Sequence, residues 1–97
     1  MRKKNTESIG EVLRQYFDEN KFLKVKLAES RIINGWKDIL GKTIASYTSG
    51  LYIRNGVLYI SLTSSVLRSE LSLAKDDLIK KLNDYAGLTV VKDIVLK

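Results

Sequence analysis

Hydrophobic and polar positions alternate most clearly between residues 51 and 63, with the period of two that is typical of β-strands. Asn55-Gly56 interrupts this alternation. It is the strongest short-range signal for a two-residue hairpin, because a type I′ turn needs positive φ at both central residues. The turn predicts a fixed register: Arg54 opposite Val57, Ile53 opposite Leu58, Tyr52 opposite Tyr59, and Leu51 opposite Ile60.

The two faces of this predicted hairpin differ in chemistry. The core face is aliphatic and carries Leu51, Ile53, Leu58, Ile60 and Leu62. The outer face carries Tyr52, Arg54, Val57, Tyr59, Ser61 and Thr63. Two tyrosines and an arginine on an open sheet can stack nucleic-acid bases. The simpler interpretation, which the sequence alone favours, is a cross-strand aromatic pair that contributes about 0.2–1 kcal/mol to sheet stability.

Two helical segments precede the hairpin. The first is expected from about Thr6 to Asp18, after a disordered basic N-terminus of residues 1–5. Thr6 is one candidate N-cap, and Ser8 with Glu11 fits a capping box. Its apolar face consists of Ile9, Val12, Leu13, Tyr16 and Phe17.

Residues 22–27 alternate like a strand but lie between helical segments, and we interpret them as a connector. The second helix is expected from about Leu27 to Leu40, with Gly41 at its C-terminal cap. Trp36, the only tryptophan, is predicted to anchor the core. Residues 42–47 are expected to add one more turn.

One long helix and one strand are predicted after the hairpin. Ser64 or Ser65 caps the helix, which runs to about Ala86 and ends at Gly87. Its apolar positions are Leu67, Leu71, Ala74, Leu78, Leu82 and Tyr85, with Leu73 and Ile79 widening the apolar face. Residues 88–96 form the strand, with Ile94 and Leu96 toward the core.

The predicted order is therefore α-α-β-β-α-β. Because a helix crosses between the last two strands, the third strand is expected to lie parallel to a neighbouring hairpin strand. The result is an α+β fold, with a three-stranded mixed sheet and helices packed on one face. The face with Tyr52 and Tyr59 is open unless the N-terminal helix covers it.

The amino-acid composition limits the possible classes of function. The 97 residues suit one domain, expected to span residues 6–97. The chain contains no cysteine and no histidine, so disulfides, thiolate metal sites and the commonest general base are excluded. No convincing pair of catalytic carboxylates is present, and we expect no enzyme activity, no cofactor and no small-molecule substrate. No signal peptide or membrane span is recognisable, so a cytoplasmic protein is expected.

The charge indicates a class of partner. The net charge is +6, from 17 basic and 11 acidic side chains. The excess lies in an N-terminal tip and in residues 21–42. These regions contain Arg2, Lys3, Lys4, Lys21, Lys24, Lys26, Arg31, Lys37 and Lys42. Such clusters are typical of contact with nucleic acid or an acidic protein, and the same charge also serves solubility.

Arg68 is a further candidate, because it lies in the first turn after the two serines. Free N–H groups at a helix start can hold a phosphate with an arginine beside them. The alternative is that the serines are caps and no more. The sequence leaves both interpretations open.

Several motifs follow one another in a specific order. They are Trp36-x-x-x-x-Gly41, Tyr47-Thr48, Leu58-Tyr59-Ile60, the segment from Ser64 to Leu71, Leu82-Asn83 and Ile94-Val95-Leu96. Over residues 6–97 this set resembles the DciA family of bacterial replicative-helicase loaders, formerly a domain of unknown function. The resemblance is greatest to the short, Bacteroides-type versions.

The resemblance implies a KH-like fold, binding of single- or double-stranded DNA, contact with a DnaB-type helicase, and no catalysis. The absence of a Walker A pattern agrees with the last point. Residues 66–86 depart from true KH domains, because they lack a G-x-x-G loop and read as one helix. Longer members continue beyond the domain. If that tail supplies contacts, Arg2, Lys3 and Lys4 are expected to replace it.

Two other functions fit the same observations. The chain could be a KH-like RNA-binding module, although the missing G-x-x-G counts against it. It could also be a protein-interaction domain without nucleic acid, whose basic surface meets an acidic partner and whose sheet edge accepts a strand.

Overall fold

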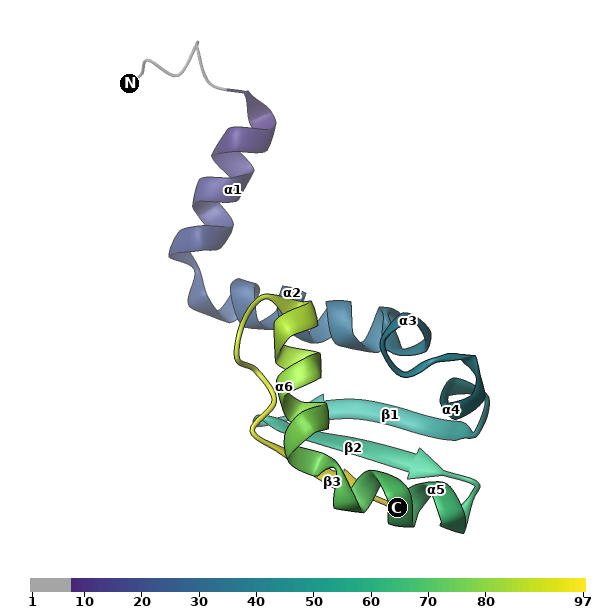
Figure 1. Ribbon diagram of the computed structural model, residues 1–97. Helices are drawn as coiled ribbons and strands as arrows, with labels where there is room; N and C mark the ends of the chain where they lie inside the picture. Colours follow the sequence, from purple (N-terminus) through teal and green to yellow (C-terminus); the bar gives the residue numbers. More distant parts are fainter. Residues whose placement is uncertain (1–7) are drawn as a thin grey trace.

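The computed structural model describes residues 8–97, apart from the side chains of residues 17 and 18 (Figure 1). The elements are α1 (Ile9–Glu19), α2 (Lys21–Asn34), α3 (Trp36–Leu40), α4 (Lys42–Ser46), β1 (Thr48–Arg54), β2 (Val57–Leu62), α5 (Ser65–Leu73), α6 (Lys75–Ala86) and β3 (Asp93–Leu96). This order confirms the α+β class. The predicted disordered tip, with Arg2, Lys3 and Lys4, lies outside the described residues.

β1 and β2 form the predicted hairpin. Asn55 and Gly56 have φ angles of 52° and 82°, as the type I′ turn requires. The pairing follows the predicted register from the turn outward to Leu51 and Ile60. β1 begins at Thr48, earlier than predicted, and a β-bulge lies at its start.

β3 completes a mixed sheet in the order β1-β2-β3, parallel to β2. It is shorter than the predicted strand of residues 88–96, because Asn83 holds the preceding backbone. Its Oδ1 accepts from the N–H groups of Val90 (3.0 Å) and Val91 (2.9 Å), and its Nδ2 donates to the Val91 carbonyl (3.0 Å). These bonds satisfy buried backbone groups where no strand pairs with them.

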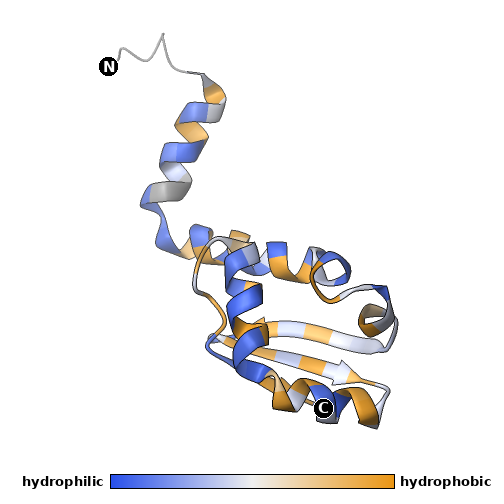
Figure 2. Ribbon diagram, viewed as in Figure 1, coloured by the Kyte–Doolittle hydropathy of each residue, from blue (hydrophilic) through white to orange (hydrophobic). Residues whose placement is uncertain are grey.

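The core lies between the sheet and the helices packed against it (Figure 1). Apolar positions alternate with polar ones along both hairpin strands (Figure 2). The most deeply buried large side chains are Ile32, Leu58, Ile60, Leu82, Val91 and Ile94. Trp36 is buried as predicted, and its Nε1 donates to Thr48 Oγ1 at 3.0 Å.

The connector predicted for residues 22–27 is wrong, because α2 already begins at Lys21. Asn20 caps it, with its Oδ1 accepting from the Leu23 N–H at 3.1 Å. Ala28 and Ile32 turn one helical face into the core, while Phe22 stays 68% exposed. An alternating sequence thus lies on a helix whose apolar residues do not all face inward.

The helix predicted from Leu27 to Leu40 is broken at Gly35, between α2 and α3. A Cβ at Gly35 would lie 2.5 Å from the hydroxyl oxygen of Tyr85, because that ring packs directly over the Gly35 backbone. Tyr85, predicted on the apolar face of the last helix, instead covers this helix break and is 46% exposed.

The helix predicted between residues 65 and 86 is also two helices, α5 and α6. The break falls at Ala74, which has φ −114° and ψ 24°. Leu73, predicted to widen the apolar face, is instead 90% exposed. Two helices therefore stand where one was expected, and no glycine joins them. The KH-like detail of the predicted fold remains a prediction.

α1 projects from the end of α2, away from the sheet (Figure 1). Ser8 is its N-cap, because Ser8 Oγ accepts from the Glu11 N–H at 3.1 Å. The predicted apolar face is present but largely unburied: Ile9 is 79% exposed and Leu13 is 50% exposed. α1 thus leaves the outer face of the sheet uncovered.

Candidate nucleic-acid interface

The outer face of the hairpin carries a stacked aromatic pair. Tyr52 on β1 and Tyr59 on β2 are direct cross-strand partners, with ring centroids 4.7 Å apart and planes 13° apart. Lys97 Nζ lies 5.7 Å from the Tyr52 centroid and 5.3 Å from the Tyr59 centroid. Arg54 is exposed on the same strand as Tyr52. Aromatic and cationic groups therefore occur together on this face.

The stack limits what the tyrosines can bind. The ring faces that meet in the stack are occupied, so a base can stack only on an outer ring face. Since Lys97 is almost equally far from both centroids, it lies beside the pair rather than over one outer face. Tyr52 is 47% exposed, whereas Tyr59 is half-buried between its neighbours. Tyr52 is thus the more available ring.

Lys97 is a residue that we did not predict as part of this face. Val95 pairs with Tyr59 in the parallel ladder, and Ile94 is fully buried. Alternation along β3 therefore puts Val95 and Lys97 on the outer face. The sequence analysis predicts Ile94 and Leu96 toward the core, and the same alternation predicts Lys97 on the opposite face.

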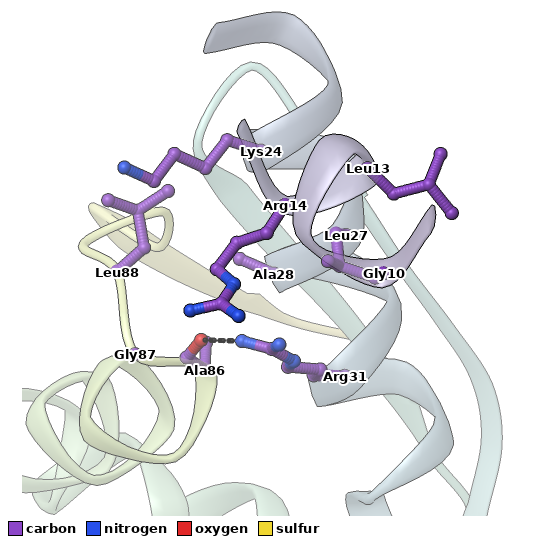
Figure 3. A pocket seen from close by; sticks show the side chains of 10 residues that line it. All are labelled: Gly10, Leu13, Arg14, Lys24, Leu27, Ala28, Arg31, Ala86, Gly87 and Leu88. Carbon is purple, nitrogen blue, oxygen red and sulfur yellow. Dashed lines mark hydrogen bonds between the residues drawn. The ribbon is translucent and has the colours of Figure 1, made fainter. Parts of the chain in front are cut away.

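The basic side chains of α2 separate onto different sides of the helix. Lys24 and Arg31, seven residues apart, share one side. With Arg14 of α1 they line a pocket of about 430 Å³ between α1, α2 and the end of α6 (Figure 3). Arg31 Nη1 donates to the Ala86 carbonyl at 3.0 Å. Arg14 is a second cation that the sequence analysis missed.

Lys26 lies on the other side of α2, toward β1. Its Nζ is 3.4 Å from Glu29 Oε1 and 5.6 Å from the Phe22 ring centroid. It lines a shallow pocket together with Tyr52. Lys26 is therefore a neighbour of the outer sheet face, whereas Lys24 and Arg31 are not part of that pocket.

The remaining predicted lysines are dispersed. Lys21 lines a small pocket with Lys24 near the start of α2. Lys37 on α3 and Lys42 on α4 are exposed. α3 and α4 follow the far end of α2, opposite α1 (Figure 1). The basic segment of residues 21–42 thus forms several separate clusters instead of one continuous patch.

Arg68 has a structural role. Its Nη1 donates to the Leu62 carbonyl at 2.6 Å and lies 3.5 Å from the Lys97 carbonyl oxygen. Arg68 therefore links α5 to the ends of β2 and β3. The cap is Ser64, whose Oγ accepts from the Leu67 N–H at 3.2 Å. A phosphate contact at Arg68 stays a prediction.

Two negative findings concern the described part of the chain. Within residues 8–97, no group of three or more acidic side chains is placed to hold a metal ion. None of the helices described there has the length and apolar character needed to cross a membrane.

The geometry defines a small basic α+β domain with a mixed three-stranded sheet, an aromatic–cationic outer face and a projecting amphipathic helix. The sequence model of the family described as Dna[CI] antecedent, DciA, matches residues 8–96. The chain therefore belongs to the DciA family, which confirms the resemblance and gives the protein a replication-related accessory role. Among curated proteins, none matches this chain.

Proposed function

We propose that this protein is a non-catalytic cytoplasmic replication factor that binds DNA and a DnaB-type helicase and assists helicase loading. The family match over residues 8–96 carries the proposal, because it covers nearly the whole chain. The net charge of +6 supports a nucleic-acid partner. In this proposal residues 6–97 form a single KH-like domain.

The outer sheet face is the proposed DNA-contacting surface. Tyr52 offers a ring for base stacking, while Arg54, Lys97 and Lys26 can contact phosphates on either side of it. Lys37 and Lys42 are exposed and can extend the phosphate contacts along the molecule. This surface needs no G-x-x-G loop.

The apolar face of α1 is the proposed helicase-contacting surface. Ile9, Val12 and Leu13 are between 47% and 79% exposed. A contiguous apolar face that the domain itself leaves uncovered is typical of a protein–protein contact, with an amphipathic helix laid into a groove of the partner.

DNA binding is tested by fluorescence anisotropy with labelled single- and double-stranded oligonucleotides. If three or more phosphates are contacted, the affinity should fall about tenfold or more between about 50 and 200 mM salt. A flat salt response would contradict the phosphate mechanism. An RNA strand of equal sequence that binds much more tightly than the DNA would favour the RNA-binding alternative.

Base stacking is tested with Tyr52→Ala. Loss of one stacked base should weaken single-stranded DNA binding about tenfold. Tyr47→Ala is the matched control, since Tyr47 is 44% exposed and lies outside the stacked pair. Equal affinities of the two variants would exclude Tyr52 as a stacking residue.

Helicase contact is tested by capture of purified DnaB-type helicase in the presence of nuclease. Ile9→Ser should reduce capture, because Ile9 is the most exposed of the apolar side chains described on α1. Gln15→Ser, on the polar side of α1, should leave capture unchanged. Capture of wild type that disappears with nuclease would show that DNA bridges the two proteins.

A further inference from the structure

The pocket between α1, α2 and the end of α6 brings three cationic side chains together (Figure 3). Arg14 comes from α1, and Lys24 and Arg31 come from α2. None of the ten described residues that line the pocket is acidic. Among the described side chains the ion pairs are Lys26–Glu29 and Lys80–Asp84, so none of the three cations pairs with a described acidic side chain.

Arg31 is fixed in orientation, whereas its binding capacity is largely unused. Its Nη1 donates to the Ala86 carbonyl at 3.0 Å, at the C-terminus of α6, where the helix dipole favours a cation. A guanidinium carries five N–H donors, so most of them remain available. The Arg14 guanidinium points to the same place, and Lys24 extends over Leu88 (Figure 3).

The walls of the pocket also suit a particular ligand. Leu27, Ala28 and Leu88 supply apolar surface, while Gly87 brings backbone without a side chain to the rim. A volume of about 430 Å³ exceeds what a bare anion needs. An anion that carries an organic group would use both the cations and the apolar walls.

We propose that this pocket binds a phosphate group of a nucleotide. Arg14 and Arg31 supply planar donor pairs that match phosphate oxygens, and Lys24 adds a point charge. The inference rests on the proposed nucleic-acid binding for the source of the phosphate. The site is separate from the Tyr52–Tyr59 face, because Lys24 and Arg31 lie across α2 from Lys26. Single-stranded DNA would therefore meet the protein at two places.

The first test is an NMR titration with inorganic phosphate at constant ionic strength. Saturable shifts of the Gly87 and Leu88 amides and of Arg14 Nε are expected. Arg14→Gln and Lys24→Gln should each weaken binding about tenfold or more. Lys81→Gln is the matched control, because it removes one charge from an exposed position of α6 outside the pocket.

Wild type that shows no saturable binding, or Arg14→Gln and Lys81→Gln variants that bind phosphate equally, would exclude a phosphate site. Neither pocket variant removes Arg31, which holds the end of α6. Each variant is folded if its amide NMR spectrum resembles that of the wild type.

Three further ligands identify the source of the phosphate: a 5′-phosphorylated oligothymidylate, its 5′-hydroxyl counterpart and thymidine monophosphate. A preference for the phosphorylated strand that Arg14→Gln abolishes assigns a strand end. Equal binding of both strands, weakened by Arg14→Gln, assigns an internal phosphate. A mononucleotide that binds while neither strand does would support the pocket and contradict the proposed DNA binding, so the two failures can be distinguished.

Discussion

At the scale of single residues, Asn83 decides how the chain returns from α6 to the sheet. Its amide makes three hydrogen bonds with the backbone of Val90 and Val91. Both valines are buried, so their backbone groups cannot exchange these bonds for water.

Asn83→Ala should therefore lower the free energy of unfolding by about 3 kcal/mol, because it leaves buried N–H groups unsatisfied. Asn83→Asp keeps the acceptor, so its free energy of unfolding should lie between those of the wild type and Asn83→Ala. Urea denaturation measures both variants. Asn34→Ala, at an exposed position, is the control and should change stability by no more than about 0.5 kcal/mol. Equal effects at the two asparagines would contradict this role for Asn83.

Residues whose surroundings are local were predictable, and those that depend on contacts between distant elements were not. The Asn55-Gly56 turn fixes its own φ angles and therefore the strand register beside it. Arg14 meets Lys24 and Arg31 only once the angle between α1 and α2 is known. The cation cluster was thus beyond sequence reasoning, although the shared side of Lys24 and Arg31 follows from their spacing.

At the scale of elements, the breaks between helices are the main difference between prediction and structure. Apolar periodicity continues across Gly35 and Ala74, so a sequence pattern cannot show where the helix axis turns. The break at Gly35 lies directly under the Tyr85 ring, a contact from another element that the local sequence pattern does not reveal.

This contact predicts a coupling between Gly35 and Tyr85. Gly35 has φ −96° and ψ 8°, which alanine can adopt, so only the ring opposes a Cβ there. Gly35→Ala should destabilise the wild type by about 1 kcal/mol, but it should be neutral or stabilising in a Tyr85→Ala background. A double-mutant cycle from denaturation curves measures this. Additive effects would mean that the ring does not oppose the Cβ.

α1 should be the least stable helix of the described chain. An isolated helix of 11 residues is marginal in water, and α1 leaves most of its apolar face unburied. Hydrogen exchange should be fast for α1 amides and slow for those of Leu58 and Ile60 in β2. Slow exchange of α1 without a partner would show that its apolar face is covered in solution.

At the scale of the whole molecule, the position of α1 makes the protein elongated. The radius of gyration is 16.8 Å, whereas a compact domain of this length has about 13 Å. Small-angle X-ray scattering at low concentration should therefore give a value near the larger figure. A value near the smaller one would mean that α1 folds back onto the domain.

The parallel pairing of β2 with β3 also has a kinetic consequence. The hairpin closes a loop of two residues, while Leu58 meets Ile94 only after the chain has passed through α5 and α6. Because long loops cost more entropy to close, β3 should dock after the transition state for folding. The conservative substitution Ile94→Val removes one methylene group from the core. It should accelerate unfolding and leave the refolding rate nearly unchanged. The outer face acquires Lys97 in that same late step, so the aromatic–cationic surface is complete only when the last strand has joined.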